Sequence, residues 1–199
     1  MRYTYDPTRD IFSKSVSGSE EEKRLAGESA AAMVSEGDIV GLRTGSTALY
    51  AIQTLGKAIE QGLDIQGVST SFQSSQLAEG VGIPLLRLSE VDRIDIAIDG
   101  ADQVAGFDLV KGGGAAHTRE KIVASAAEKF IVAVDSTKVS EVLNKTVPVE
   151  VIFSSRTIVS SRIKNIGGNP ELRYSVRKDG PVSTENSIEA KISIILYKD

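Results

Sequence analysis

The sequence predicts an α/β fold, in which a mostly parallel sheet carries helices on both faces and a smaller α+β subdomain follows it. Two observations lead to this prediction. Short apolar segments alternate with stretches of helical period over residues 20–143, and this alternation stops after Asn144. We therefore predict a leader over 1–19, an α/β domain over 20–143 and a small subdomain over 144–199.

The predicted helices follow from composition and period. Residues 20–34 are rich in strong helix formers, and Ser19 stands where an N-cap is needed. Residues 44–62 begin with capping residues and then place apolar side chains at helical spacing. Two further helices are predicted in the first domain, at 71–82 and 115–128, and one in the subdomain, near 155–166.

The predicted strands are short runs of apolar, often β-branched residues between these helices. In the first domain they lie at 38–42, 65–70, 84–88, 93–99, 108–111 and 129–135. In the subdomain we predict strands at VPVEVIF (147–153), at ELRYSVRK (171–178) and in the last stretch of the chain.

Composition excludes several classes of protein. The net charge of −4 gives no reason to expect nucleic acid or an anionic membrane as a partner. No apolar run approaches the roughly 20 residues that span a bilayer. The 199 residues include no cysteine and one histidine, His117, so thiolate and histidine-cluster metal sites are excluded. The lack of cysteine fits a reducing compartment, so we predict a cytoplasmic protein. We also predict that the protein has no metal and no cofactor.

Three loops at predicted strand ends are candidates for chemistry, because ligands bind at the carboxyl edge of open α/β sheets. The first is GLRTGSTA (41–48). Its backbone N–H groups and hydroxyls could hold a phosphate at a helix N-terminus, and the alternative is an ordinary capped turn. It matches neither the Walker loop nor the dinucleotide fingerprint. The phosphate candidates are Thr44, Gly45, Ser46 and Thr47.

The second loop is IDGADQV (98–104), in which Asp99 and Asp102 flank Gly100. Paired carboxylates can bind sugar hydroxyls, hold a divalent metal or cap the next turn. The metal interpretation is weaker, because no further set of ligands accompanies the pair.

The third loop is VKGGGAAHTREK (110–121). Three consecutive glycines, Gly112, Gly113 and Gly114, suggest a close approach to the backbone. With a helix starting near 115, Glu120 falls in its second turn and can act as a general base, while Lys111 and the backbone N–H groups stabilise an oxyanion. The alternative for Glu120 is an exposed residue paired with Lys121 or Lys129.

Two further residues have simpler interpretations. His117 is expected to be a surface or packing residue, because nothing in the sequence supplies it with a catalytic partner. Lys138, in VDSTK, is either a counter-charge for a phosphate or a solvated loop lysine. Together, the loops describe a sugar-phosphate pocket.

From about Glu20 to about Thr184 the chain resembles type A ribose-5-phosphate isomerases. The motifs that carry the resemblance occur in the same order, and they are KRLAGESAA, TGSTA, TSFQS, GIPLLRL, VDRIDIAIDGAD, VKGGGAAHTREKIVA, FIVAVDSTK, PVEV and GGNPELR. The resemblance implies a metal-free aldose–ketose isomerase that interconverts D-ribose 5-phosphate and D-ribulose 5-phosphate through a cis-enediolate. It also implies a shortened ferredoxin-like subdomain and a homodimer or homotetramer.

The resemblance assigns roles to the candidate residues. Glu120 would move the proton between C1 and C2, and Asp99 would help to open the furanose ring. Asp102 and Lys111 would orient the substrate and the developing charge, and the glycine backbone would support the enediolate oxygens. The residues that would hold the phosphate are Thr44, Ser46, Thr47, Lys138 and Lys23.

The chain departs from the family pattern at several places. Arg43 stands where the family usually has glycine, Gln103 where it has glutamate, and His117 where it has leucine. The sequence diverges after about Asn186, and the leader is longer than usual. The altered C-terminus puts the oligomer contact in question more than the chemistry. Two alternatives remain open, a non-catalytic sugar-phosphate sensor, which would not require Glu120 and Lys111, and an inactive truncated paralogue.

Overall fold

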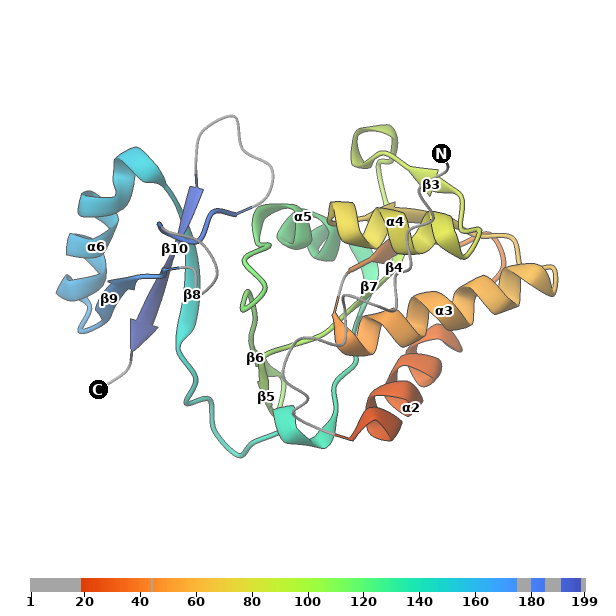
Figure 1. Ribbon diagram of the computed structural model, residues 1–199, viewed down its shortest axis with the longest axis horizontal. Coiled ribbons are helices and arrows are strands. Elements are labelled where there is room, and N and C mark those ends of the chain that lie inside the picture. The colour runs from red at the N-terminus through yellow and green to blue at the C-terminus, as the bar shows by residue number, and fades with distance from the viewer. Residues whose placement is uncertain (1–18, 44, 175–179, 185–190, 198–199) are drawn as a thin grey trace. The chain divides into compact units, whose positions relative to one another are not determined.

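The computed structural model describes residues 19–43, 45–174, 180–184 and 191–197 (Figure 1). The chain divides into two compact units, which we describe separately. Unit 1 is Met1–Gly100 with Ile122–Thr137, and unit 2 is Ala101–Lys121 with Lys138–Asp199. This division differs from the predicted boundary at 143–144, because residues 101–121 and 138–143 group with the C-terminal part of the chain.

Unit 1 contains a five-stranded sheet in which every pairing is parallel, as the sequence predicts. The strand order is β3-β2-β1-β4-β7. The chain builds outward from β1 through β2 to β3, and then crosses to the other side of β1 to form β4 and β7. The strands are β1 (Ile39–Leu42), β2 (Gln66–Ser69), β3 (Leu85–Leu86), β4 (Ile94–Asp99) and β7 (Ala127–Val132).

Helices cover both faces of this sheet, which confirms the prediction. On one face α2 (Glu20–Ala31), α3 (Ser46–Glu60) and α4 (Phe72–Gly80) bury apolar side chains against alternate residues of β1 and β4. On the other face Val123, from α5 (Thr118–Ala126), packs with residues of β2 and β4. This packing requires Gly41 in β1, because a Cβ there would lie 2.6 Å from Cγ1 of Val123.

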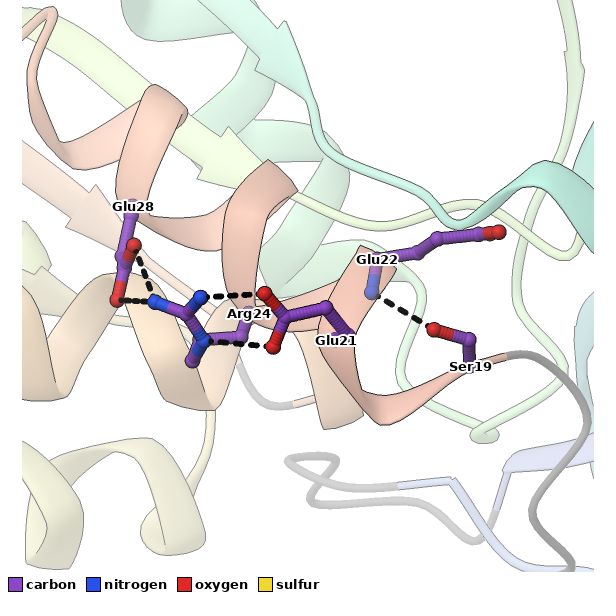
Figure 2. Close-up of polar contacts among 5 residues, drawn as sticks. All are labelled: Ser19, Glu21, Glu22, Arg24 and Glu28. Carbon is purple, nitrogen blue, oxygen red and sulfur yellow. Dashed lines mark hydrogen bonds and ion pairs between the residues drawn. The ribbon is translucent and has the colours of Figure 1, made fainter.

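Helix α2 begins as the sequence predicts. Ser19 caps it by accepting the N–H of Glu22 at 3.1 Å (Figure 2). Figure 2 also shows Arg24 between the carboxylates of Glu21 and Glu28, with N–O distances of 2.6 and 2.7 Å. These are exposed pairs one helical turn apart, so they support the helix locally and contribute little to tertiary stability.

Unit 2 contains an antiparallel hairpin and a separate antiparallel sheet. The hairpin pairs β5 (Gln103–Ala105) with β6 (Asp108–Val110). The sheet has the order β8-β10-β9, from β8 (Val147–Ile152), β9 (Asn169–Leu172) and β10 (Lys191–Tyr197). Helix α6 (Arg156–Asn165) lies beside this sheet (Figure 1). Its residue Val159 packs against Val151 of β8. Three short 3-10 turns complete the described elements, at Leu88–Glu90, Ser136–Lys138 and Phe153–Ser155.

Several element boundaries differ from the predictions. Strand β6 was predicted from the sequence but β5 was not, because Gln103–Ala105 directly follows the loop at Gly100–Asp102 and was assigned to it. Helix α5 starts at Thr118 instead of 115, because Ala115 has a φ of 61°, outside the helical region. Strand β9 starts at Asn169 instead of 171 and includes Pro170, which an edge strand tolerates. The predicted leader falls outside the described residues up to position 18.

Candidate functional site

The carboxyl ends of β1 and β4 form the edge of unit 1 at which a ligand site is expected. These strands are adjacent, with Leu42 opposite Ile98, and the direction in which the sheet grows reverses between them. Open α/β sheets bind ligands at such a switch point, because the loops leaving the two strands diverge there. Arg43 and Asp99 stand at these two strand ends.

Arg43 and Asp99 form a buried ion pair. The Nη1 of Arg43 donates to Oδ1 of Asp99 at 2.7 Å, and the two side chains are 12% and 6% exposed. The N–H of Gly100 donates to the same oxygen at 2.6 Å. Sequence reasoning identified Asp99 as a site residue and Arg43 only as a departure from the family pattern, so the partnership between them was missed.

The loop after Arg43 leads into α3. Gly45 is the N-cap of this helix, in an extended conformation, and it supplies no side-chain cap. Gly45 and Ser46 are exposed, whereas Thr47 is buried. The first-turn N–H groups of a helix have no intrahelical partners, so an uncapped and accessible N-terminus is suited to an anion. Thr44, the remaining phosphate candidate in this loop, lies outside the described residues.

Lys23 lies in a polar contact between α2 and α3. Its ammonium is 2.7 Å from Oε1 of Glu20, and the hydroxyl of Tyr50 donates to Oε2 at 2.8 Å. The hydrogen bonds from Lys23 and then Tyr50 lower the pKa of Glu20, and the bond to Glu20 raises the pKa of Tyr50. Because the ammonium of Lys23 is buried beside a carboxylate, its phosphate role remains a prediction that would require this pair to open.

The VDSTK loop after β7 is held by α2. One carboxylate oxygen of Glu22 accepts both the N–H and the hydroxyl of Ser136, at 2.9 and 2.7 Å. The side-chain hydrogen bond from Ser136, followed by the backbone one, lowers the pKa of Glu22. Asp135 is buried and accepts the N–H of Thr137 at 3.0 Å. Lys138 ends this turn as a half-buried residue of unit 2.

Side chains of unit 2 hold the glycine loop on two sides. The N–H of Gly113 donates to Oδ2 of Asp102 at 2.7 Å, and its carbonyl accepts from Nη2 of Arg173 at 2.7 Å. Asp102 is itself placed by its backbone, since its N–H bonds to Val110 at 2.8 Å and its carbonyl accepts from Lys145 at 2.7 Å. Asp102 therefore orients the loop peptide in addition to any contact with a ligand.

The same neighbours explain why two of these positions are glycine. Gly112 has a φ of 95°, which favours glycine, and a Cβ there would overlap Cε1 of His117. A Cβ on Gly113 would lie 2.5 Å from Oδ1 of Asp102. His117 thus contacts the loop, in keeping with the packing role that the sequence suggests. The close approach that the three glycines predict is made, at least in part, by residues of this chain.

Glu120 is the third residue of α5, and it lies in the first turn because the helix starts later than predicted. It is buried, with 6% of the residue exposed, so the alternative of an exposed residue paired with a lysine does not describe it. Thr118, at the start of α5, donates a hydrogen bond to Glu150 of β8. Lys111, directly after β6, is half-buried.

Gln103 shows why an amide replaces a carboxylate after Asp102. Its Nε2 donates to Ser140 at 2.8 Å and to Asn144 at 2.7 Å, and its Oε1 accepts the N–H groups of Asn144 and Lys145 at 3.0 and 2.9 Å. A carboxylate can only accept, whereas an amide does both. We did not predict from the sequence that Gln103 and Arg173 position the loops of unit 2. The only signal for Arg173 was its place in the family motif GGNPELR.

Two negative observations apply to the part of the chain that the structure describes. No group of three or more histidine, aspartate or glutamate side chains there could hold a metal ion. No helix there has the length and apolar character needed to cross a membrane.

Comparison with known proteins gives consistent matches. The family model for ribose 5-phosphate isomerase A (phosphoriboisomerase A) matches residues 66–189. The isomerase A of Haloarcula marismortui is 54% identical over 169 residues, which cover 85% of this chain and 74% of the relative. That of Methanosarcina acetivorans is 52% identical over 167 residues, covering 83% and 71%.

Solved structures agree with these matches. The isomerase A of Methanocaldococcus jannaschii superposes with a TM-score of 0.83 at 40% identity, covering 89% of this chain and 80% of the other. A D-ribose-5-phosphate isomerase solved in complex with phospho-erythronic acid superposes with a TM-score of 0.84 at 39% identity, covering 92% and 80%.

Proposed function

This chain belongs to the ribose-5-phosphate isomerase A family, and from that premise we propose that it interconverts D-ribose 5-phosphate and D-ribulose 5-phosphate with Glu120 as the base. The observation that carries the assignment is Glu120 itself, a buried carboxylate in the first turn of α5. Burial shields a general base from bulk water, and the family match supplies the reaction.

The proposed reaction starts from the open-chain aldose. Glu120 removes the proton on C2, the C–H electron pair forms the C1=C2 double bond, and negative charge develops on O1. A proton then passes from O2 to O1. Return of the proton from Glu120 to C1 gives the ketose, so one carboxyl group serves first as base and then as acid.

The developing charge requires donors that are already oriented. We assign this role to Lys111 and to the N–H groups of Gly112 and Gly114. The N–H of Gly113 is engaged by Asp102, so Asp102 supports the enediolate site by orienting the loop as well as by contacting the substrate. Asp99 is assigned to the opening of the furanose ring.

We assign the 5-phosphate to the uncapped N-terminus of α3, with Gly45, Ser46, Thr47 and Thr44, and to Lys138. Lys23 remains a further candidate through the opening of its pair with Glu20. Support for a phosphorylated sugar as the substrate of this chain comes from the solved relative in complex with phospho-erythronic acid. That molecule carries a phosphate and a carboxylate, and the carboxylate has a charge distribution similar to that of an enediolate.

The location, the assembly and the partners of the enzyme are also proposals. We propose a cytoplasmic location and assembly as a homodimer or homotetramer, both on the basis of the family resemblance. We propose no nucleic-acid partner and no membrane attachment, in keeping with the net charge of −4.

The test is conversion of ribose 5-phosphate by the purified protein in EDTA, with Glu120→Gln and Glu128→Gln in parallel. Glu128 is exposed and serves as the matched control. Loss of a general base typically costs about 10²–10⁴-fold, so E120Q is expected to lose at least that factor in kcat while E128Q keeps wild-type turnover. A wild-type protein that binds the sugar phosphate without converting it would support the sensor alternative.

A further inference from the structure

The pair between Arg43 and Asp99 differs from an ordinary surface salt bridge. Both side chains are nearly buried, at 12% and 6% exposed, and their N–O distance is 2.7 Å. The other described Arg–Asp pair that involves β4 joins Arg93 to Asp95 at 3.4 Å, with Arg93 62% exposed. Exposed pairs of that kind contribute little, whereas a buried carboxylate depends strongly on its cation.

The geometry restricts the carboxylate of Asp99. Its Oδ1 accepts from the guanidinium at 2.7 Å and from the N–H of Gly100 at 2.6 Å. A planar guanidinium and a backbone N–H on one oxygen limit rotation about the bond that carries the carboxylate. Asp99 is therefore presented at the switch point of the sheet in a defined orientation and as an anion that accepts hydrogen bonds.

We propose that Arg43 is a positioning residue that holds the carboxylate of Asp99 in the orientation that opens the furanose ring of the substrate. This inference rests on the proposed function and on the role it assigns to Asp99. In the ring-opening step Asp99 takes the proton of the C1 hydroxyl, and the O–H electron pair becomes the C1=O double bond. The C1–O4 bond breaks, and O4 takes up the proton that Asp99 gives back.

The chemistry of the two substrates separates this step from enolisation. Ribose 5-phosphate is mostly a furanose and must open before C2 can lose its proton. Ribulose 5-phosphate has its O5 blocked by the phosphate, so its C2 carbonyl cannot form a five-membered ring. Exchange of its C1 proton with solvent therefore requires Glu120 but no ring opening.

The experiment compares wild type, Arg43→Gln, Arg43→Lys and the control Arg93→Gln in two assays. One measures kcat and KM for conversion of ribose 5-phosphate. The other follows deuterium incorporation at C1 of ribulose 5-phosphate in D₂O by NMR. The second assay also reports whether each variant is folded and able to bind a phosphorylated substrate.

In R43Q we expect kcat for ribose 5-phosphate to fall by roughly 10- to 100-fold with KM nearly unchanged, because misorientation of a reacting group has effects of this size. C1 exchange should stay within about threefold of wild type, because enolisation does not use the pair. R43K keeps the charge but not the planar fork, so it should lie between R43Q and wild type. R93Q should match wild type in both assays.

Equal losses in the two assays for both R43Q and R43K would overturn the proposal, since Arg43 would then support the site as a whole. Unchanged conversion by R43Q would also overturn it. Absence of both activities from the wild-type protein would instead contradict the proposed function, which keeps the two failures distinct.

Discussion

The N–H and the carbonyl of Gly113 both form hydrogen bonds with side chains of unit 2, and these contacts restrict which residue can occupy the position. Asp102 accepts its N–H and Arg173 donates to its carbonyl. The space where a Cβ would point is filled by the carboxylate of Asp102. Backbone and side chain are therefore matched at this position, and a change in one displaces the other.

We predict that Gly113→Ala lowers kcat by about tenfold or more, because the displaced carboxylate of Asp102 releases the loop peptide. The measurement is steady-state conversion of ribose 5-phosphate, alongside thermal unfolding. Gly80→Ala is the matched control, since nothing lies within 4 Å of a Cβ there. Gly80 ends α4, where alanine is favoured by up to about 1 kcal/mol. Wild-type kcat in G113A would contradict the prediction.

At the scale of elements, α2 packs closely against α3. A Cβ on Gly27 would lie 2.7 Å from Cβ of Tyr50, so the two helices approach to the limit that glycine allows. Glu20 adds a polar contact between them through Tyr50 and also pairs with Lys23. Because α3 starts at the proposed phosphate loop, the contact between α2 and α3 helps to hold that loop in position.

We predict that this contact contributes a pH-dependent part of stability. The pKa of Glu20 is lowered from 4.5 in the folded state, so the unfolded chain binds the proton more tightly. The stabilisation is therefore present above pH 4.5 and is lost as pH falls through the lowered folded pKa. Since the side chain of Glu20 is 42% exposed, solvent screening keeps the effect modest.

The measurement is the difference in Tm between wild type and Glu20→Gln as a function of pH. We expect the difference to be largest near neutral pH and to shrink below pH 4.5. Glu79→Gln, on the exposed part of α4, should show no such change. A difference between wild type and E20Q that grows on acidification would contradict the assignment.

At the scale of the whole molecule, the exposed apolar residues of unit 2 bear on the proposed homo-oligomer. Unit 2 exposes large apolar side chains, among them Phe107 at the hairpin turn and Ile166 after α6, which are 106% and 83% exposed. A contiguous exposed apolar patch is typical of a surface that contacts another protein. Phe107 and Ile166 are therefore candidates for the contact surface of the proposed homo-oligomer.

We predict that the purified protein elutes at two or four times its chain mass of 21.2 kDa, as measured by light scattering during size-exclusion chromatography. If assembly buries them, Phe107→Asp or Ile166→Asp should shift the mass downward, because a charge cannot be buried cheaply in an interface. A wild-type species of 21.2 kDa at micromolar concentration would contradict the prediction.

The sequence by itself determined the parallel sheet, the helices on its two faces and the identity of the candidate residues. Hydrophobic period and capping are local properties, and Ser19 as the cap of α2 was predicted from them. The order of motifs also identified the family. The β5 strand was missed because its residues follow directly on the loop at Gly100–Asp102 and were assigned to that loop. The start of α5 was misplaced because the positive φ of Ala115 has no periodic signal.

Only the tertiary structure decided which side chains act on which. Arg43 and Asp99 are 56 residues apart in the chain, and Gly113 and Arg173 are 60 apart. Such pairs depend on strand order and loop path, which no local pattern encodes. From the sequence, the glycines of 112–114 were predicted to let a ligand approach the backbone closely. The structure shows that the side chains of His117 and Asp102 lie where Cβ atoms on Gly112 and Gly113 would point, because the chain packs closely there.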